Sequence, residues 1–222
     1  MRDLFVSLLV LGLLPSCFRK PFVGLCLFSL LAYMRLQDLS WGFAREVRWS
    51  FYVAIVMFAG ALVSARDRSY MAKDWRCYVM ILLMGVVGVS VVIAGQYDDN
   101  VTGGYTEFGK IIIISLFTTG IVTSRDRLRL LIWVIALSFG FFSLKAGLVG
   151  IATLGQQQII QGPGGMLKDN NDFALALAMG VPMLWHIASS EKRTSLRRLF
   201  FLLVPMAGIT IMMTHSRGGF LA

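Results

Sequence analysis

The sequence is poor in charged residues, cysteine and histidine. Of its 222 residues, 15% are charged, and it contains 3 cysteines and 2 histidines. A water-soluble globule of this size needs a polar exterior, which so few charged side chains cannot supply. The cysteines lack paired C-x-x-C spacing, and the chain has no H-E-x-x-H, G-x-S-x-G or P-loop motif. These absences argue against a soluble domain and leave metal, nucleotide and serine-hydrolase sites without support.

Apolar runs make up most of the chain instead. Hydrophobic residues account for 57% of the sequence, and the mean hydropathy is +0.72. A membrane-crossing helix needs about 20 mainly apolar residues, and shorter runs are tolerated where the bilayer thins. The pattern therefore predicts an all-α polytopic membrane bundle of eight crossings, with a ninth helix beginning at the C-terminus. The eight runs cover residues 4–15, 22–34, 47–64, 77–94, 108–123, 130–154, 173–189 and 199–214.

The first two runs are short and allow two arrangements. They meet at Phe18-Arg19-Lys20-Pro21, where the proline removes one helical hydrogen bond and clashes with the preceding turn. The two runs then form either a tight helical hairpin or one long helix broken at this point. Either arrangement leaves the next loop on the same side of the membrane.

The basic residues predict the orientation. The formal net charge is +9, but lysine and arginine lie in short clusters between apolar runs, which argues against a nucleic-acid partner. Residues 65–76, 124–129 and 190–198 are rich in these cations and are expected in the cytoplasm. Residues 95–109, 155–170 and 215–217 are then expected outside. Arg35, Arg45 and Arg48 also fall on the outer side and do not follow the rule.

Lys145 is the first candidate binding residue, because an ionisable group at membrane depth is costly. It lies well inside the run 130–154. Two interpretations are equally weighted. Its long stem reaches the outer interface, or its ammonium lines a pocket that opens outward.

A loop and helix start supply the second candidate. The sequence Gly162-Pro163-Gly164-Gly165 predicts a turn. Asp169, Asn170, Asn171 and Asp172 then precede an apolar run, as is typical of a helix N-terminus. Capping is the simpler interpretation. The alternative is that this helix start, with Lys168 and Asn171, offers amide donors and positive potential to an anionic head group.

Arg217 is the third candidate. Its guanidinium is always charged and carries a fork of donors suited to phosphate. Gly218 and Gly219 follow it and allow a ligand or another helix to come close. Taken alone, Arg217 is more simply explained as an interfacial anchor. Together with Lys145 and Lys168, it favours an anionic, lipid-linked ligand on the outer side.

Several stretches together carry a family resemblance. They are MRDLFVSLLVLGLLPSCFRKPFVGLCLFSLLAYMRLQDLSWGFA, SLKAGLVGIATLG, GPGGMLKDNNDFALALAMGVPMLWH and MTHSRGGFLA. In combination, the chain resembles the amino-terminal part of the O-glycosylation ligases associated with exosortase A systems. Those proteins belong to the O-antigen ligase and polymerase superfamily. The resemblance covers essentially all 222 residues.

The resemblance implies a multi-pass protein of the bacterial inner membrane, acting with membrane lipids. Such a protein transfers a glycan from an undecaprenyl-diphosphate carrier to an acceptor at the periplasmic face, without a metal or other cofactor. Arg217, in the S-R-G motif with Ser216, matches a diphosphate-binding arginine of the superfamily. The expected diphosphate-binding residues are thus Lys145, Lys168, Asn171, Ser216 and Arg217, and the acceptor is not identified.

The resemblance also implies a longer protein, with a catalytic histidine in a later periplasmic loop that this chain lacks. Residues 1–222 are therefore expected to form one transmembrane domain, the amino-terminal portion of a ligase-type protein that is inactive without the rest. No catalytic residue is assigned. The alternatives are a transporter or flippase-like protein and a non-catalytic membrane scaffold, whose small faces at Gly85, Gly88, Gly147 and Gly150 suit close helix approach.

Overall fold

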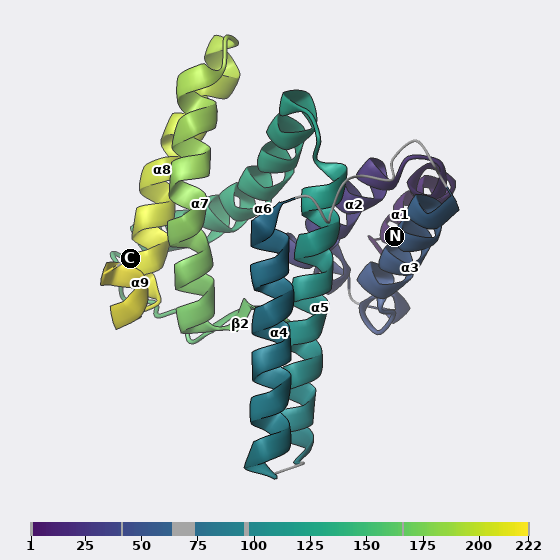
Figure 1. Cartoon of the computed structure of the whole chain (residues 1–222). Coiled ribbons are helices and arrows are strands. Elements are labelled where there is room, and N and C mark those ends of the chain that lie inside the picture. The colour runs from purple at the N-terminus through teal and green to yellow at the C-terminus, as the bar shows by residue number, and fades with distance from the viewer. Residues whose placement is uncertain (1, 41, 64–73, 96–97, 166, 222) are drawn as a thin grey trace.

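A computed structural model describes residues 2–40, 42–63, 74–95, 98–165 and 167–221 (Figure 1). A helix covers each of the eight apolar runs, and a ninth, short helix follows, so the all-α prediction is confirmed apart from one small β-hairpin. The helices are α1 (Arg2–Arg19), α2 (Pro21–Tyr33), α3 (Trp49–Val63), α4 (Trp75–Ala94), α5 (Asp99–Ile121), α6 (Arg125–Ala152), α7 (Asn170–Ser190), α8 (Thr194–Met213) and α9 (Arg217–Leu221). Two 3-10 helices, η1 (Leu36–Leu39) and η2 (Phe43–Arg45), and the strands β1 (Gln161–Gly164) and β2 (Leu167–Asp169) complete the fold.

Four of the helices are long and apolar enough to cross a membrane. They are α4, α6, α7 and α8, with 20, 28, 21 and 20 residues. Helices α2 and α3 are also apolar but have only 13 and 15 residues. The four long helices identify the chain as a membrane protein.

Helices α1 and α2 form a hairpin. Lys20 separates them with a non-helical backbone, and Pro21 begins α2, where its missing N–H is not needed. The start of α1 lies beside the segment after α2, because Oδ1 of Asp3 accepts hydrogen bonds from the amides of Gly42 (3.0 Å) and Ala44 (3.3 Å). The hairpin arrangement is therefore confirmed, and the alternative of one long broken helix is wrong.

Helices α6, α7 and α8 pack together as the main core. Leu184 and Ala188 of α7 meet Phe200 and Leu203 of α8 in one buried cluster. Small residues bring α6 and α8 close, since a Cβ at Gly147 would lie 3.0 Å from the carbonyl oxygen of Met206. Helix α2 joins this core through a second cluster that includes residues of α3, α5 and α6, namely Leu25, Met57, Phe117, Ile121 and Leu131.

Helices α4 and α5 form a second hairpin that extends beyond the other helices (Figure 1). The two helices run antiparallel, because Cys77 contacts Thr119 (Sγ to Oγ1, 3.7 Å) near one end and Gly88 faces Tyr105 further along. Only 6% of the membrane-spanning window of α4 is buried, compared with 39% for α6, α7 and α8. Most of the surface of α4 therefore has no protein neighbour among the described residues.

The prediction of a loop over residues 95–109 is largely wrong. Helix α5 begins at Asp99, well before the apolar run starts at residue 108. Its first turns are polar, with Thr102 Oγ1 donating to the carbonyl oxygen of Asp98 (3.0 Å) and an ion pair between Lys110 and Glu107 (2.6 Å). Apolar runs follow hydropathy rather than helix length, so they miss polar turns at the start of a helix.

One end of the bundle is strongly basic. The guanidinium of Arg127 lies 5.4 Å from the ring centre of Phe22, and Arg129 pairs with Glu191 (3.7 Å), so the α1–α2, α5–α6 and α7–α8 turns lie together. Helices α2, α4, α6 and α8 begin at this end. Asp74, Asp126 and Glu191 are its described acidic residues. Its described cations are Arg19, Lys20, Arg76, Arg125, Arg127, Arg129, Lys192, Arg193, Arg197 and Arg198; Arg66, Arg68 and Lys73 of the predicted basic loop lie outside the described residues.

Candidate functional site

The segments that carry four of the five predicted binding residues meet at the opposite end of the bundle. There, Nδ2 of Asn170 donates a hydrogen bond to the carbonyl oxygen of Thr214 (3.0 Å). The amide of Ile159 donates a second one to the carbonyl oxygen of Met213 (2.9 Å). These two bonds bring the β-hairpin and the start of α7 against the turn between α8 and α9. We call this meeting point the outer junction; of the predicted binding residues it contains Lys168, Asn171, Ser216 and Arg217.

The β-hairpin positions Lys168. Strands β1 and β2 pair antiparallel, with Gly164 opposite Leu167 and Gln161 opposite Asp169. The backbone turns at Gly164 (φ 107°) and Gly165 (φ 58°), where glycine accepts a positive φ without steric cost, so the predicted turn is confirmed. Since neighbouring strand residues point to opposite faces, Leu167 is buried in the cluster with Phe139 and Phe173, and Lys168 is exposed.

The start of α7 is capped by its own sequence. Oδ1 of Asp169 accepts a hydrogen bond from the amide of Asn171 (2.7 Å), which satisfies one of the free amides at a helix N-terminus. The capping interpretation is thus confirmed. The side chain of Asn171 is exposed, and its role toward an anion stays a prediction. Asp169 and the exposed Asp172 give this helix start negative charge alongside Lys168.

Ser216 and Arg217 have different surroundings. Ser216 is 3% exposed, and its Oγ accepts a hydrogen bond from the amide of Gly219 (3.0 Å), so it caps the first turn of α9. Its own amide donates to Oγ1 of Thr214 (3.3 Å). Arg217 is exposed. The observed role of Ser216 is therefore to shape the turn that presents Arg217, and direct contact of Ser216 with a ligand stays a prediction.

Lys145 does not join the outer junction through any described contact. Its side chain is exposed and lies on the face of α6 opposite Gly147, which packs on α8. Within the described ranges it has no hydrogen bond and no ion pair. The structure thus leaves both interpretations of Lys145 open, but it does not place Lys145 with Lys168 and Arg217.

Arg35 is a residue that the sequence analysis did not propose for the site. It has a left-handed backbone (φ 49°), and its Nε forms an ion pair with Oδ2 of Asp38. Its guanidinium lies against Gly164 and Gly165, and a Cβ at Gly165 would overlap Nη1. Arg35 therefore holds the turn of the β-hairpin against the segment after α2. The signal was present in the sequence, since Arg35 is one of the three arginines that did not follow the charge rule.

The outer junction carries exposed charges of both signs. Lys168 and Arg217 supply exposed cations, and Asp169 and Asp172 supply carboxylates that face the start of a helix. In the part of the chain that the structure describes, no group of three or more His, Cys, Asp or Glu side chains could hold a metal ion.

Comparison with known proteins identifies the family. The profile of a family of unknown function, DUF5935, matches residues 1–195. The chain belongs to the DUF5935 family. No curated protein and no solved structure matches it.

The DUF5935 match divides the outer junction. It runs from the start of the chain to the first residues of α8, so it includes Lys168 and Asn171 as well as Arg35 and Lys145. Ser216 and Arg217 follow the matched region. The β-hairpin and its contact with Arg35 therefore lie wholly within the DUF5935 part of the chain, while the turn that presents Arg217 lies beyond it.

Proposed function

We propose that this DUF5935 protein acts in O-antigen ligase-type glycan transfer, and that its outer junction binds the diphosphate of an undecaprenyl-linked glycan. The observation that carries the proposal is the hydrogen bond between Asn170 and Thr214 (3.0 Å). It brings two cations, Lys168 and Arg217, to one junction although they are far apart in sequence. Lys168 and Arg217 bind the diphosphate in this proposal, and no residue described by the structure carries out the transfer step.

The chemistry of the two cations suits a diphosphate. The guanidinium of Arg217 can donate two parallel hydrogen bonds to phosphate oxygens, and the ammonium of Lys168 acts as a compact point charge. Neutralising both phosphates would also stabilise the carrier diphosphate as it leaves during transfer. Asn171 lies at the start of α7 and offers an exposed amide side chain.

The proposed location is the bacterial inner membrane, with the outer junction at the periplasmic face. Lysine and arginine dominate the opposite end of the bundle, as is typical of a cytoplasmic side. The end that carries the outer junction has both signs of charge, with Asp3, Asp38, Asp98 and Asp169 among its acids. In this arrangement α1 to α8 make eight crossings, and the short helices α2 and α3 are accommodated by local thinning of the bilayer.

Binding of a short-chain polyprenyl diphosphate to the purified chain in lipid nanodiscs tests the proposal. Arg217→Ala and Lys168→Ala should each weaken binding about tenfold, since each removes one charge-assisted contact. Lys110→Ala is the matched control. Lys110 is an exposed cation on α5, away from the outer junction, and it already pairs with Glu107 of the same helix. Unchanged affinity in both junction variants would reject the proposal, and a matching loss in Lys145→Ala would add Lys145 to the site.

The second candidate is a membrane scaffold, favoured by the open surface of α4. Most of the glycines that were expected to contact partner helices pack against helices of this chain instead. Gly147 and Gly150 face α8, and Gly88 faces Tyr105 of α5. Gly85 alone of these four has open space around it. Capture of partner proteins that depends on α4, with no diphosphate binding, would favour the scaffold. Uptake of a soluble solute into proteoliposomes would favour a transporter instead.

A further inference from the structure

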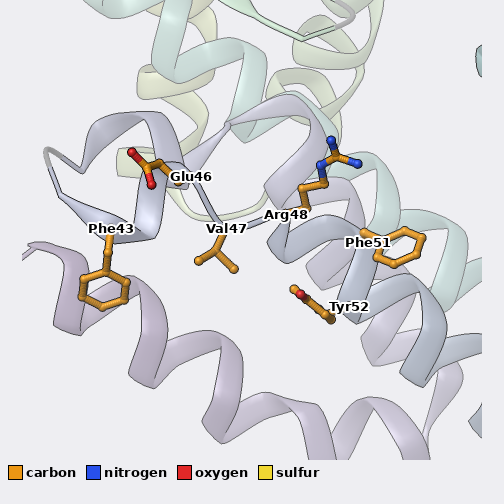
Figure 2. A pocket seen from close by; sticks show the side chains of 6 residues that line it. All are labelled: Phe43, Glu46, Val47, Arg48, Phe51 and Tyr52. Carbon is orange, nitrogen blue, oxygen red and sulfur yellow. The ribbon is translucent and has the colours of Figure 1, made fainter. Parts of the chain in front are cut away.

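A pocket lies where the chain enters α3, apart from the outer junction. It is an open recess with a volume of about 550 Å³, and five of its six lining residues are exposed. Six residues from η2, the following turn and the start of α3 line it: Phe43, Glu46, Val47, Arg48, Phe51 and Tyr52 (Figure 2). None of the residues proposed for diphosphate binding contributes to it.

Aromatic rings form much of the pocket wall. Phe43 lies on one side, and Phe51 and Tyr52 lie on the other, with Val47 between them (Figure 2). The three rings are 57%, 58% and 51% exposed. Phe51 and Tyr52 sit in the first turn of the apolar helix α3, and Phe43 lies in η2 just before it. The end of an apolar helix is where aromatic side chains gather between acyl chains and head groups. Their exposure is therefore expected to be toward lipid.

The pocket also contains two opposite charges that are not paired. Glu46 and Arg48 project on either side of Val47 (Figure 2). Neither side chain has a hydrogen bond or ion pair with a residue in the described ranges, although both line the same pocket. A pocket that keeps a carboxylate and a guanidinium apart presents one partner for a cation and one for an anion.

We propose that this pocket binds the head group of a zwitterionic phospholipid, one that carries both a phosphate and an ammonium. Arg48 binds the phosphate through its fork of donors. Glu46, on the other side of Val47, accepts hydrogen bonds from the ammonium. The exposed aromatic wall receives the glycerol region and the first part of the acyl chains. This inference does not depend on the proposed role in glycan transfer.

The charges distinguish this occupant from an anionic lipid. A head group with a phosphate and no ammonium would satisfy Arg48 and leave Glu46 facing a net negative charge. A soluble zwitterion such as phosphoethanolamine would satisfy both charges and leave the aromatic wall uncovered. A phospholipid with an ammonium satisfies all three features of the pocket.

The test uses the full chain in detergent micelles, with bound lipid counted by native mass spectrometry. Phosphatidylethanolamine should bind about threefold to tenfold more tightly than phosphatidylglycerol. Glu46→Gln should remove this preference, because it removes the partner of the ammonium. Arg48→Gln should weaken both lipids about tenfold, because the phosphate is common to them. Arg45→Gln is the matched control, since Arg45 is exposed in the same segment and does not line the pocket.

Three results would overturn the inference. Equal binding of the two lipids by the unmodified chain would show that the ammonium is not recognised, as would a preference that persists in Glu46→Gln. Displacement of the lipid by soluble phosphoethanolamine at similar concentration would show that the acyl region contributes nothing. If Glu46→Gln does not fold, Phe51→Ala supplies a second test, because loss of the wall should weaken lipid binding and leave phosphoethanolamine binding unchanged.

Discussion

Helices α4 and α8 are both long enough to cross a membrane, each with 20 residues, yet their surroundings differ greatly. Helix α4 is the more apolar of the two, and 6% of its spanning window is buried, compared with 39% for α8. In water the more apolar helix would be the more buried one. In a bilayer, acyl chains are as apolar as leucine, so apolar side chains gain little by leaving them for a protein neighbour.

Small and polar residues explain which helix packs. Gly140 and Gly147 of α6 face α8, where any side chain would meet Leu203 or Met206. Thr210 of α8 is fully buried, and its Oγ1 donates to the carbonyl oxygen of Ser143 on α6 (3.2 Å). On α4, by contrast, a Cβ at Gly85 would meet no atom within 4 Å. Close backbone approach and interhelical hydrogen bonds, rather than hydropathy, therefore separate the packed helices from α4.

The largest expected effect comes from removing a packed leucine. Leu184 of α7 is fully buried, whereas Leu82 of α4 is 67% exposed. Leu184→Ala should lower the free energy of unfolding by about 2–4 kcal/mol, because it leaves a cavity. Leu82→Ala should change it by less than about 0.5 kcal/mol. Equilibrium unfolding in mixed micelles measures both, and equal losses would contradict the distinction between the two regions.

A smaller effect is expected from filling the space at a glycine. A Cβ at Gly147 would lie 3.0 Å from the Met206 carbonyl oxygen and 3.1 Å from its Cβ. Gly147→Leu should therefore cost about 1–3 kcal/mol of unfolding free energy through overpacking. Gly85→Leu is the matched control on α4 and should cost almost nothing. A comparable loss at Gly85 in the purified chain would show that α4 packs against something in its native state.

The smallest effect separates two turns with the same backbone conformation. Gly95 after α4 and Gly165 in the β-hairpin have φ values of 63° and 58°, but only Gly165 lies against Arg35. Gly95→Ala and Gly165→Ala should each lower the free energy of unfolding by about 1 kcal/mol, because alanine is strained at a positive φ. Gly165→Ala should lower the free energy of unfolding by up to about 1 kcal/mol more, because its Cβ clashes with Arg35. The backbone amides of the β-hairpin should then exchange hydrogen faster in Gly165→Ala.

Adding Arg35→Ala to Gly165→Ala removes the clashing side chain. The combined variant should therefore recover the additional loss, while Arg35→Ala combined with Gly95→Ala should show no such recovery. If the losses in unfolding free energy simply add in both double variants, Arg35 does not hold the turn of the β-hairpin.

The sequence was sufficient to locate the helices, because each apolar run became one. It misjudged the start of α5, where Asp98 and Thr102 support polar helical turns that hydropathy does not detect. It predicted the turn at Gly164 and Gly165 but not the two strands around it. Strand pairing over so few residues depends on Leu167 being buried against Phe139 and Phe173, a contact between segments that are distant in the chain.

The candidate site was predictable by residue type and not by arrangement. Lys168 and Arg217 were predicted to be outer cations, but the contact between the segments that carry them depends on a hydrogen bond between residues 44 positions apart, Asn170 and Thr214. Ser216 was expected to contact a ligand, which stays a prediction, while its cap on α9 was not foreseen. Lys145 was grouped with them on depth alone, which does not determine the face of a helix.

The basic end of the bundle combines like charges that repel each other. Four helices begin there, so the partial positive charge of their N-termini adds to arginines such as Arg127 and Arg197, which costs each helix some stability. A transmembrane voltage acts on the same charges, at about 2.3 kcal/mol per elementary charge for each 100 mV. In the proposed orientation the basic end faces the negative side, and the voltage then pulls both the side chains and the helix termini toward the side where they already lie. What weakens each helix singly becomes, in an energised membrane, a force that resists inversion of the whole bundle.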